Sequence, residues 1–435
     1  MVRLLENQLL KEKVYMRQIA PGLEVFVLPK KGYVKKYVTY AANFGSIDSR
    51  FIVEGEDKEL SVPDGVAHFL EHKLFEDEEG NVFDRFARLG ASSNAFTNFN
   101  NTAYLFSCTD YFTECLDLLM DFVQTPYFTL ESVEKEKGII EQEIRMYEDN
   151  AQWRIFFNLL AAMYKEHPVR VDIAGTVESI RQIDKDVLYK CYRTFYHPSN
   201  MALFVVGDVD PGRVMDQVEA NISKRNYKEL GEIKRIYPSE PAELGQDFVR
   251  QELVVSQPLL NLGFKERDLG YQGERLFKKE LTTNLVLDVV FGSSSKLYNE
   301  LYEEGLIDDE FDAGYVAEKD YGHTILGGKT VDADRLLERL TVGIKVAKKN
   351  GISAAQFEHY RRKAMGEFLK SFNSLEFITN NFLAYHFRQI NFFTYLDVLQ
   401  SVTLADVNSR LHQHLVEDSM VRSLILPKNS YSHHG

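Results

Sequence analysis

The stretch Gly65-Val66-Ala67-His68-Phe69-Leu70-Glu71-His72 decides how this sequence is interpreted. Its two imidazoles stand four residues apart, and a carboxylate follows the first of them by three, so on a helix all three project to one side. An apolar period runs over residues 66–75, directly after the turn residues Pro63-Asp64-Gly65. We therefore predict a helix over 66–75, with Asp64 as its cap.

Two imidazoles at this spacing can grip one metal ion. Zinc binds neutral imidazole nitrogen and carboxylate oxygen, and a catalytic zinc keeps three protein ligands and one open position. We predict His68 and His72 as ligands and Glu71 as general base, because a carboxylate beside the metal can take the proton of an attacking water. The alternative is a helix with two unrelated histidines, a pattern expected by chance in roughly one chain in a hundred.

A third ligand has to come from elsewhere in the chain. Residues 129–149 form a charged, periodic stretch that predicts a long helix, within which Glu136 and Glu143 stand seven residues apart on one face. Glu143 can reach the metal, and Glu136 can orient a histidine by accepting its other N–H. A solvated acidic face is the alternative interpretation of these glutamates.

The rest of the chain predicts two α+β domains, each a mainly antiparallel sheet packed with helices. Strand patterns occupy residues 14–28 as a hairpin, 37–44, 91–97, 103–108 and 201–206. The charged segment 226–245 carries Pro238 and Pro241 and resembles a linker. We expect an N-terminal zinc-bearing domain over 1–225, this linker, and a C-terminal homologous domain over 246–435 in which a similar element order returns.

Composition limits the class of protein. The 435 residues carry a formal net charge of -14, which argues against a nucleic-acid partner and favours cationic peptides. No apolar run approaches the length of about 18 residues needed to span a bilayer, and we expect neither a signal peptide nor a membrane partner. The three cysteines suit a reducing, cytoplasmic location, and we expect them to be buried apolar side chains.

With these motifs in place, the sequence resembles the pitrilysin, insulinase and mitochondrial processing peptidase family of inverted zinc-helix peptidases. The resemblance covers nearly the whole chain, and beyond the motifs above it rests on four further stretches: Gly45-Ser46-Ile47-Asp48, Ala91-Ser92-Ser93-Asn94-Ala95-Phe96-Thr97, Tyr196-His197-Pro198-Ser199-Asn200-Met201 and Val205-Val206-Gly207-Asp208-Val209.

The resemblance implies one Zn²⁺ per chain and peptide hydrolysis. It places the third ligand on Glu143 and a supporting role on Glu136. The strand with Asn94 and Ala95 resembles the edge strand to which an extended peptide adds by main-chain hydrogen bonds. A structural interpretation, in which Asn94 only caps a turn, stays open.

One segment of the second half departs from the family pattern. Residues 292–301 resemble the stretch that leads to an arginine and, seven residues later, a tyrosine that contacts the substrate carbonyl; here Tyr302 stands in place of the arginine, and 303–308 lack the tyrosine. The chain thereby resembles bacterial YmfH-like subunits that carry zinc beside a metal-free relative. We expect a homologous partner subunit, a heterodimer before a homodimer. The alternative function is a non-catalytic scaffold or assembly subunit of the same fold.

Overall fold

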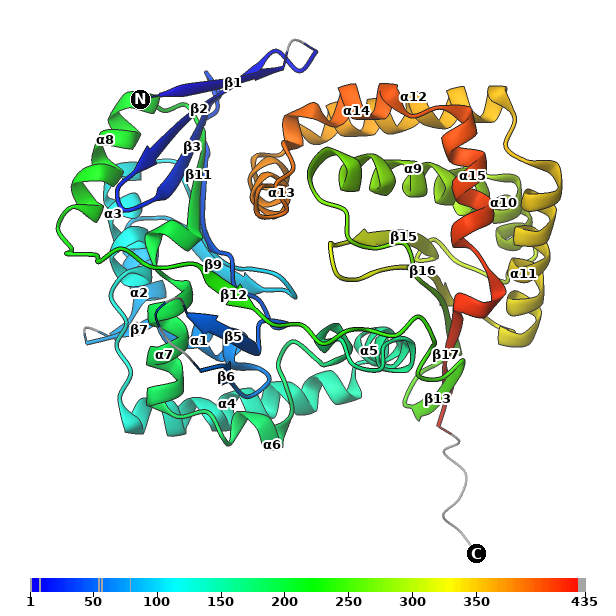
Figure 1. Ribbon diagram of the computed structural model, residues 1–435, viewed down its shortest axis with the longest axis horizontal. Helices are drawn as coiled ribbons and strands as arrows, with labels where there is room; N and C mark the ends of the chain where they lie inside the picture. The colour runs from blue at the N-terminus through cyan, green and yellow to red at the C-terminus, as the bar shows by residue number, and fades with distance from the viewer. Residues whose placement is uncertain (1, 8, 54, 56–57, 79, 429–435) are drawn as a thin grey trace, which may run out of the picture. The chain divides into compact units, whose positions relative to one another are not determined.

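The computed structural model describes residues 2–7, 9–53, 55, 58–78 and 80–428. These form two compact units. Unit 1 contains residues 1–144, 172–237 and 369–387, and unit 2 contains 145–171, 238–368 and 388–435. Each unit combines one large sheet with helices, which confirms the predicted α+β class (Figure 1).

The sheet of unit 1 has seven strands in the order β1-β2-β3-β11-β4-β10-β9. Only the neighbours β3 and β11 run parallel. Its strands are β1 (Arg3–Asn7), β2 (Glu12–Ile19), β3 (Leu23–Pro29), β4 (Lys36–Ala42), β9 (Ser92–Thr97), β10 (Thr102–Cys108) and β11 (Met201–Gly207). The strand predictions at 14–28, 37–44, 91–97, 103–108 and 201–206 are confirmed. β9 ends the order, so within the described part of the chain one of its edges pairs with no other strand.

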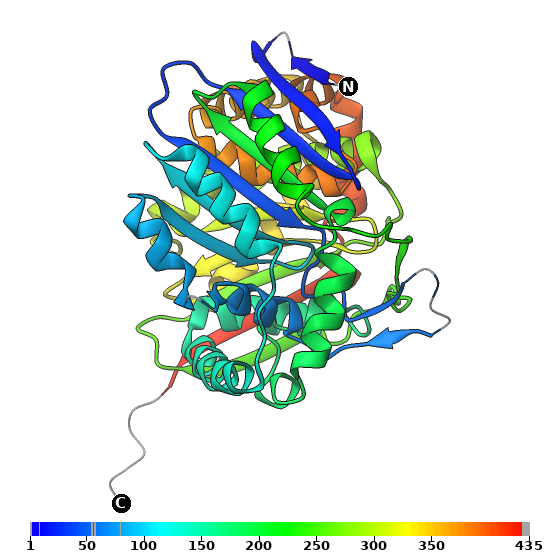
Figure 2. The same ribbon diagram turned by 90° about the vertical axis from the view of Figure 1, so that its left-hand side faces the viewer.

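Helices cover both faces of this sheet. Figures 1 and 2 show α3 (Phe112–Val123) and α8 (Pro211–Ile222) on one face, and Figure 1 shows α13 (Leu375–Phe387) on the other. Phe382 of α13 packs on Phe26 and Phe204, with ring centroids 4.7 Å and 4.6 Å apart. Further elements of unit 1 are β5 (Arg50–Val53), β6 (Leu60–Ser61), β7 (Glu76–Asp77), β8 (Gly80–Asn81), β12 (Ile233–Arg235), α2 (Val82–Arg88), α6 (Val177–Ile180) and α7 (Lys185–Phe195).

The two predicted motif helices are present. They are α1 (Val66–Leu74) and α4 (Leu130–Asp149), and α4 lies in unit 1 up to residue 144. The cap prediction for Asp64 is wrong, because Gly65 is the N-cap and no side chain caps the helix. Gly65 has φ 88°, and a Cβ there would lie 2.4 Å from the Ala174 carbonyl oxygen. The chain thus enters α1 through a backbone conformation and a close approach that favour glycine.

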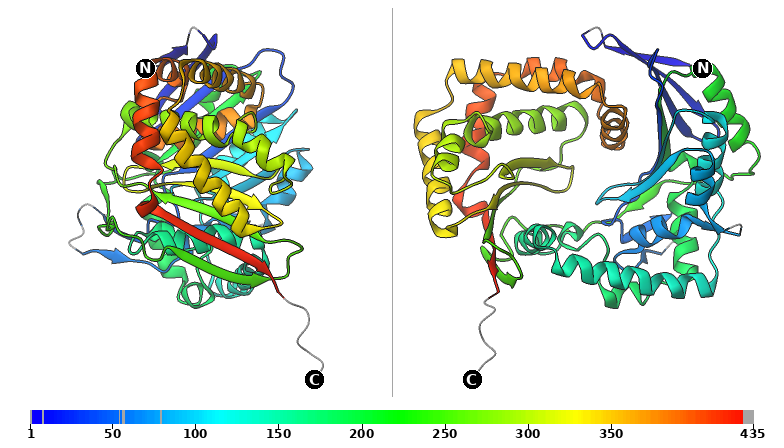
Figure 3. Two further views of the ribbon diagram at one scale, coloured as in Figure 1. Left: turned by 90° about the vertical axis from the view of Figure 1, so that its right-hand side faces the viewer. Right: turned by 180° about the vertical axis from the view of Figure 1, so that it is seen from behind.

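Unit 2 has a five-stranded sheet in the order β13-β17-β14-β16-β15. Its strands are β13 (Phe248–Leu253), β14 (Leu259–Lys265), β15 (Asp312–Ala317), β16 (Gly322–Lys329) and β17 (Met420–Pro427), and its helices are α5 (Ala151–Met163), α9 (Gly273–Phe291), α10 (Lys296–Glu303), α11 (Ala333–Asn350), α12 (Ala354–Ser371, which ends in unit 1), α14 (Tyr395–Ser401) and α15 (Leu404–His414). α5 packs on β13, β14 and β17, while α9 lies on β15 (Figures 1 and 3).

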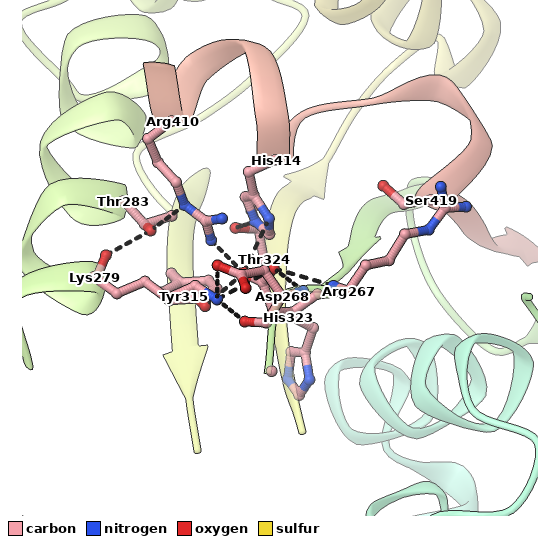
Figure 4. Close-up of polar contacts among 12 residues, drawn as sticks. Arg267, Asp268, Lys279, Thr283, Tyr315, His323, Thr324, Arg410, His414 and Ser419 are labelled. Carbon is pink, nitrogen blue, oxygen red and sulfur yellow. Dashed lines mark hydrogen bonds and ion pairs between the residues drawn. The ribbon is translucent and has the colours of Figure 1, made fainter. Parts of the chain in front are cut away.

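A buried polar cluster joins these elements of unit 2. Glu266, directly after β14, accepts hydrogen bonds from the Tyr315 hydroxyl at 2.7 Å and from the Arg410 guanidinium. The backbone N–H groups of Arg267 and Asp268 also donate to it, at 3.0 and 2.9 Å. Figure 4 shows polar contacts in this part of unit 2, with Tyr315, Arg410, Arg267 and Asp268 among the labelled residues. The carboxylate is therefore a structural hub of unit 2.

The compact units do not follow a single cut in the sequence. α5, from the first half, covers the sheet of unit 2, and α13, from the second half, covers the sheet of unit 1. The predicted linker 226–245 contains β12, which pairs with β5. The linear division into 1–225, 226–245 and 246–435 stays a prediction about sequence domains. The three cysteines are free and buried, as expected. Among the described residues, the helices are too short or too polar to cross a bilayer.

Candidate metal centre

Helices α1 and α4 of unit 1 bring the predicted ligands together. The ligand atoms of His68, His72 and Glu143 all lie within 4.8 Å of one another. The Nε2 atom of His68 lies 3.7 Å from one carboxylate oxygen of Glu143, and the Nε2 atom of His72 lies 3.4 Å from the other. The packing of the two helices thus brings together His72 and Glu143, which lie 71 residues apart in the sequence.

This donor set fits zinc. Bonds of about 2.0–2.2 Å to a tetrahedral ion place neighbouring ligand atoms about 3.3–3.6 Å apart. The separations of 3.7 and 3.4 Å run to different oxygens of Glu143 and are in the same range. With one ligand atom from each residue, the three atoms lie within 4.8 Å of one another. Two imidazole nitrogens and one carboxylate oxygen also leave one tetrahedral position for a further ligand.

Glu136 fixes the orientation of one imidazole. Its carboxylate lies 3.0 Å from Nδ1 of His72, so the proton of that ring belongs on Nδ1 and Nε2 keeps its lone pair toward Glu143. Nδ1 of His68 is buried without a hydrogen-bond partner in the described part of the chain. The two histidines are therefore held in different ways.

The pKa values of the two histidines shift in opposite directions. Burial and the neighbouring His72 lower the pKa of His68 to about 4, so its imidazole is neutral at pH 7 and suited to a metal. Burial lowers the pKa of His72 as well, but Glu136, Glu143 and Glu71 raise it more, and the net shift is upward. A bound cation would compete directly with the proton on this second ring.

Glu71 lies beside the two histidines and is held by β9. The Thr97 hydroxyl donates to one of its oxygens at 2.7 Å. Burial raises the pKa of the Glu71 carboxyl; Thr97 and His72 lower it and Glu143 raises it, and the net shift is upward. A carboxyl whose pKa is raised toward neutrality is a better proton acceptor than an ordinary one.

A cavity of about 610 Å³ opens beside this group of residues. Its lining includes Glu71, His72 and Glu136 together with Asn94 and Ala95 of β9. The carbonyl of the Asn94 side chain accepts the backbone N–H of Ala95 at 2.9 Å, so a peptide adding to this edge would have to displace that side chain. The predicted site residues thus share one surface of unit 1.

Sequence reasoning missed several residues of this surface. Thr97 gave no signal, because a threonine at the end of a strand is common and its partner lies 26 residues away. The apolar lining from Phe75, Phe83 and Ile139 was also missed, although Ile139 stands four residues before Glu143 and so faces the same side of α4.

Family models match most of the chain. Residues 51–177 match "Insulinase (Peptidase family M16)", and residues 182–364 match "Peptidase M16 inactive domain". The second match lies mainly in unit 2 and the first includes α1 and α4.

Individual relatives agree with these models. The chain is 45% identical over 429 residues to the "Uncharacterized zinc protease YmfH" of Bacillus subtilis (strain 168), covering 99% of this chain and 100% of that protein. A crystal structure of a putative M16-like peptidase from Alicyclobacillus acidocaldarius matches with a TM-score of 0.93 and 41% identity, covering 98% of this chain and 100% of that one. A protease from Helicobacter pylori shares the fold at a TM-score of 0.81 and 17% identity, covering 96% of this chain and 100% of that one.

Proposed function

The chain belongs to the insulinase family of peptidases, family M16, and from this premise we propose that it is a zinc metalloendopeptidase. Membership confirms the resemblance predicted from the motifs, and relatives named as zinc proteases support a peptidase-type function and zinc. The convergence of His68, His72 and Glu143 beside Glu71 is the observation that carries the proposal.

In this proposal His68, His72 and Glu143 hold one zinc ion per chain. The metal would supply Lewis-acid polarisation of the scissile carbonyl and a lowered pKa for water at the site. Glu71 takes the proton of the attacking water and delivers it to the leaving amine. Glu136 keeps the His72 ring oriented through its 3.0 Å contact with Nδ1.

The substrates proposed are short, unfolded peptides or a precursor peptide. The open edge of β9 offers backbone groups for strand addition at Asn94 and Ala95, and this mode needs an extended peptide. The net charge of -14 favours cationic peptides. Substrate choice would then follow length and flexibility more than a strict sequence.

We further propose that a homologous subunit completes the site, as a heterodimer before a homodimer. The segment 302–309 lacks the arginine and, seven residues later, the tyrosine of the family pattern, because Tyr302 and Asp309 stand at those two positions. Two such donors would each contribute some kcal/mol to stabilising a developing oxyanion. A chain without them needs those donors from elsewhere.

The test combines metal analysis with a peptidase assay. Zinc content and kcat/KM for one flexible peptide are measured for this chain alone, for a homologous subunit lacking the zinc motif, and for the mixture. We expect one zinc in this chain and a rate in the mixture higher by a few orders of magnitude. Full activity of this chain alone would rule out the proposal that a partner subunit completes the site. If the mixture contained zinc but hydrolysed no peptide, the result would favour the alternative function, a non-catalytic scaffold or assembly subunit.

A further inference from the structure

The hydroxyl that holds Glu71 comes from the strand proposed to bind the peptide. Thr97 is the last residue of β9, and its Oγ1 donates to Glu71 at 2.7 Å. Glu71 belongs to α1, between the two histidines. This hydrogen bond joins the edge strand to the helix that carries the candidate ligands, and the backbone N–H of Thr97 also acts on the Glu71 carboxylate.

Counting protons fixes the direction of this bond. Thr97 Oγ1 also lies 3.2 Å from Thr102 Oγ1, but Thr102 gives its only proton to the Phe44 carbonyl at 2.9 Å. Thr102 can then only accept from Thr97. The carboxylate is the nearer and the charged acceptor, so it receives the Thr97 proton.

The bond occupies one oxygen of Glu71 and leaves the other for a proton transfer. Threonine suits this position because β-branching restricts its χ1 rotation, and its backbone is fixed opposite Thr102 in the β9–β10 register. Without the hydroxyl, the carboxylate would lose its side-chain donor and keep the weaker backbone interaction with Thr97. It could then rotate away from the attack position while α1 and the ligand set remained in place. A misplacement of about 1 Å can cost about a hundredfold in rate.

We propose that Thr97 is a positioning residue, which aligns the Glu71 carboxylate with a peptide bound on β9. The inference rests on the proposed peptidase function. It also gives β9 a second role, because the strand that takes the peptide then sets the position of the base. Peptide register and base position are then coupled through one residue, Thr97, whose hydroxyl donates to the base.

The experiment compares Thr97→Val, which removes the hydroxyl at nearly the same shape, with Thr97→Ser, which retains it. Ser93→Ala is the matched control on β9, because the Ser93 hydroxyl is buried and has no partner in the described part of the chain. For each full-length variant, together with the homologous subunit, zinc content, melting temperature, kcat and KM for a flexible fluorogenic peptide are measured.

We expect Thr97→Val to lower kcat by about ten- to a hundredfold, with zinc content unchanged and KM within about twofold. Thr97→Ser and Ser93→Ala should keep kcat within about threefold. Unchanged kcat in Thr97→Val would overturn the inference, and so would a change confined to KM or a loss of zinc. Equal losses in Thr97→Val and Thr97→Ser would assign the residue to packing, which also overturns it. Failure of the peptidase proposal is distinguishable, because the unsubstituted protein would then be inactive.

Discussion

The two large sheets share one arrangement but differ in chemistry. In unit 1 the order β3-β11-β4-β10-β9 begins with a parallel pair and continues antiparallel, and in unit 2 the order β13-β17-β14-β16-β15 does the same. Between β4 and the edge strand β9 the chain forms α1, with its two histidines, and then α2, whereas between β14 and β15 it forms α9 and α10, which have no histidine. The shared topology therefore positions the candidate site without dictating it.

Two carboxylates, the partly buried Glu71 and the buried Glu266, show the same contrast. Burial raises the pKa of Glu71, and its few partners do not reverse the shift. Burial also acts upward on the pKa of Glu266, but Arg410, His414 and Lys279 reverse it and hold that pKa well below the ordinary value. An acid that is a candidate base keeps few cationic partners, and one that holds elements together is surrounded by them.

Replacing Glu71 gives the largest effect expected from this comparison. Glu71→Gln should retain zinc and lower kcat by about a thousandfold or more, because the proton acceptor is lost while His68, His72 and Glu143 remain. Glu300→Gln is the control from α10, because Glu300 pairs with Arg339 at 2.8 Å and with Lys296 at 3.6 Å, away from the predicted ligands, and its replacement should leave kcat unchanged. Metal analysis and kcat check both variants. Release of zinc by Glu71→Gln, with full zinc affinity in Glu143→Gln, would reverse the two assignments.

The next effect concerns stability in unit 2. Glu266→Gln should destabilise the protein by about 3–5 kcal/mol at pH 7, the usual cost of breaking a buried charge pair. The Arg410 guanidinium, buried beside Thr283, would lose its carboxylate partner. Glu304→Gln is the control, because its pairs with Arg335 and Arg339 are more exposed and should contribute less than about 1 kcal/mol.

The pH dependence of this variant has a definite sign. A carboxyl whose pKa is lowered by folding contributes its full stability above the unfolded-state pKa of about 4.3, and loses it as the pH falls from there toward the folded-state pKa. Denaturant midpoints between pH 7 and pH 3 should therefore fall less steeply for Glu266→Gln than for the unsubstituted protein. Parallel curves would show that Glu266 does not carry the shift.

A smaller effect, on zinc affinity, is expected from replacing Glu136, which contacts the predicted ligand His72. Glu136→Gln should lower zinc affinity about 10–100-fold, because it weakens the acceptor for Nδ1 of His72 without removing a ligand. Competition with a zinc chelator measures the change. Glu141→Gln, on the same helix and paired with Arg181 at 3.1 Å, is the control. A loss as large as that of Glu143→Gln would mean that Glu136 itself binds the metal.

The sequence predicts those parts of the site that depend on local spacing. The i, i+4 histidines and the seven-residue spacing of Glu136 and Glu143 follow from helix geometry, and so does the class of metal. The Thr97 contact could not be predicted, because it depends on how β9 packs beside α1. The Glu266 hub joins residues up to 144 positions apart in the chain, and nothing in one sequence marks such pairs.

The fold shows the same limit. Strand and helix positions follow from apolar periods, but the exchange of α5 and α13 between the compact units depends on tertiary packing alone. The sequence predicts an Asp64 cap for α1, because it cannot show that Gly65 adopts a positive φ against Ala174. The features that could not be predicted therefore depend on backbone conformation and on long-range packing.

The smallest effect is expected at Tyr302, which tests whether unit 2 contributes chemistry of its own. Tyr302 lies on α10, its side chain is 54% exposed, and its ring stacks on Tyr298 with an interplanar angle of 9°. Removing an exposed hydroxyl usually changes stability by less than about 0.5 kcal/mol, so Tyr302→Phe should keep kcat/KM within about twofold, with or without the homologous subunit. Tyr298→Phe, in the same stack, is the matched control. A fall of tenfold or more in Tyr302→Phe alone would make this hydroxyl the substitute for the missing donors. The contrast between the two units would then be wrong in its chemical part, because a residue of unit 2 would also act on the peptide.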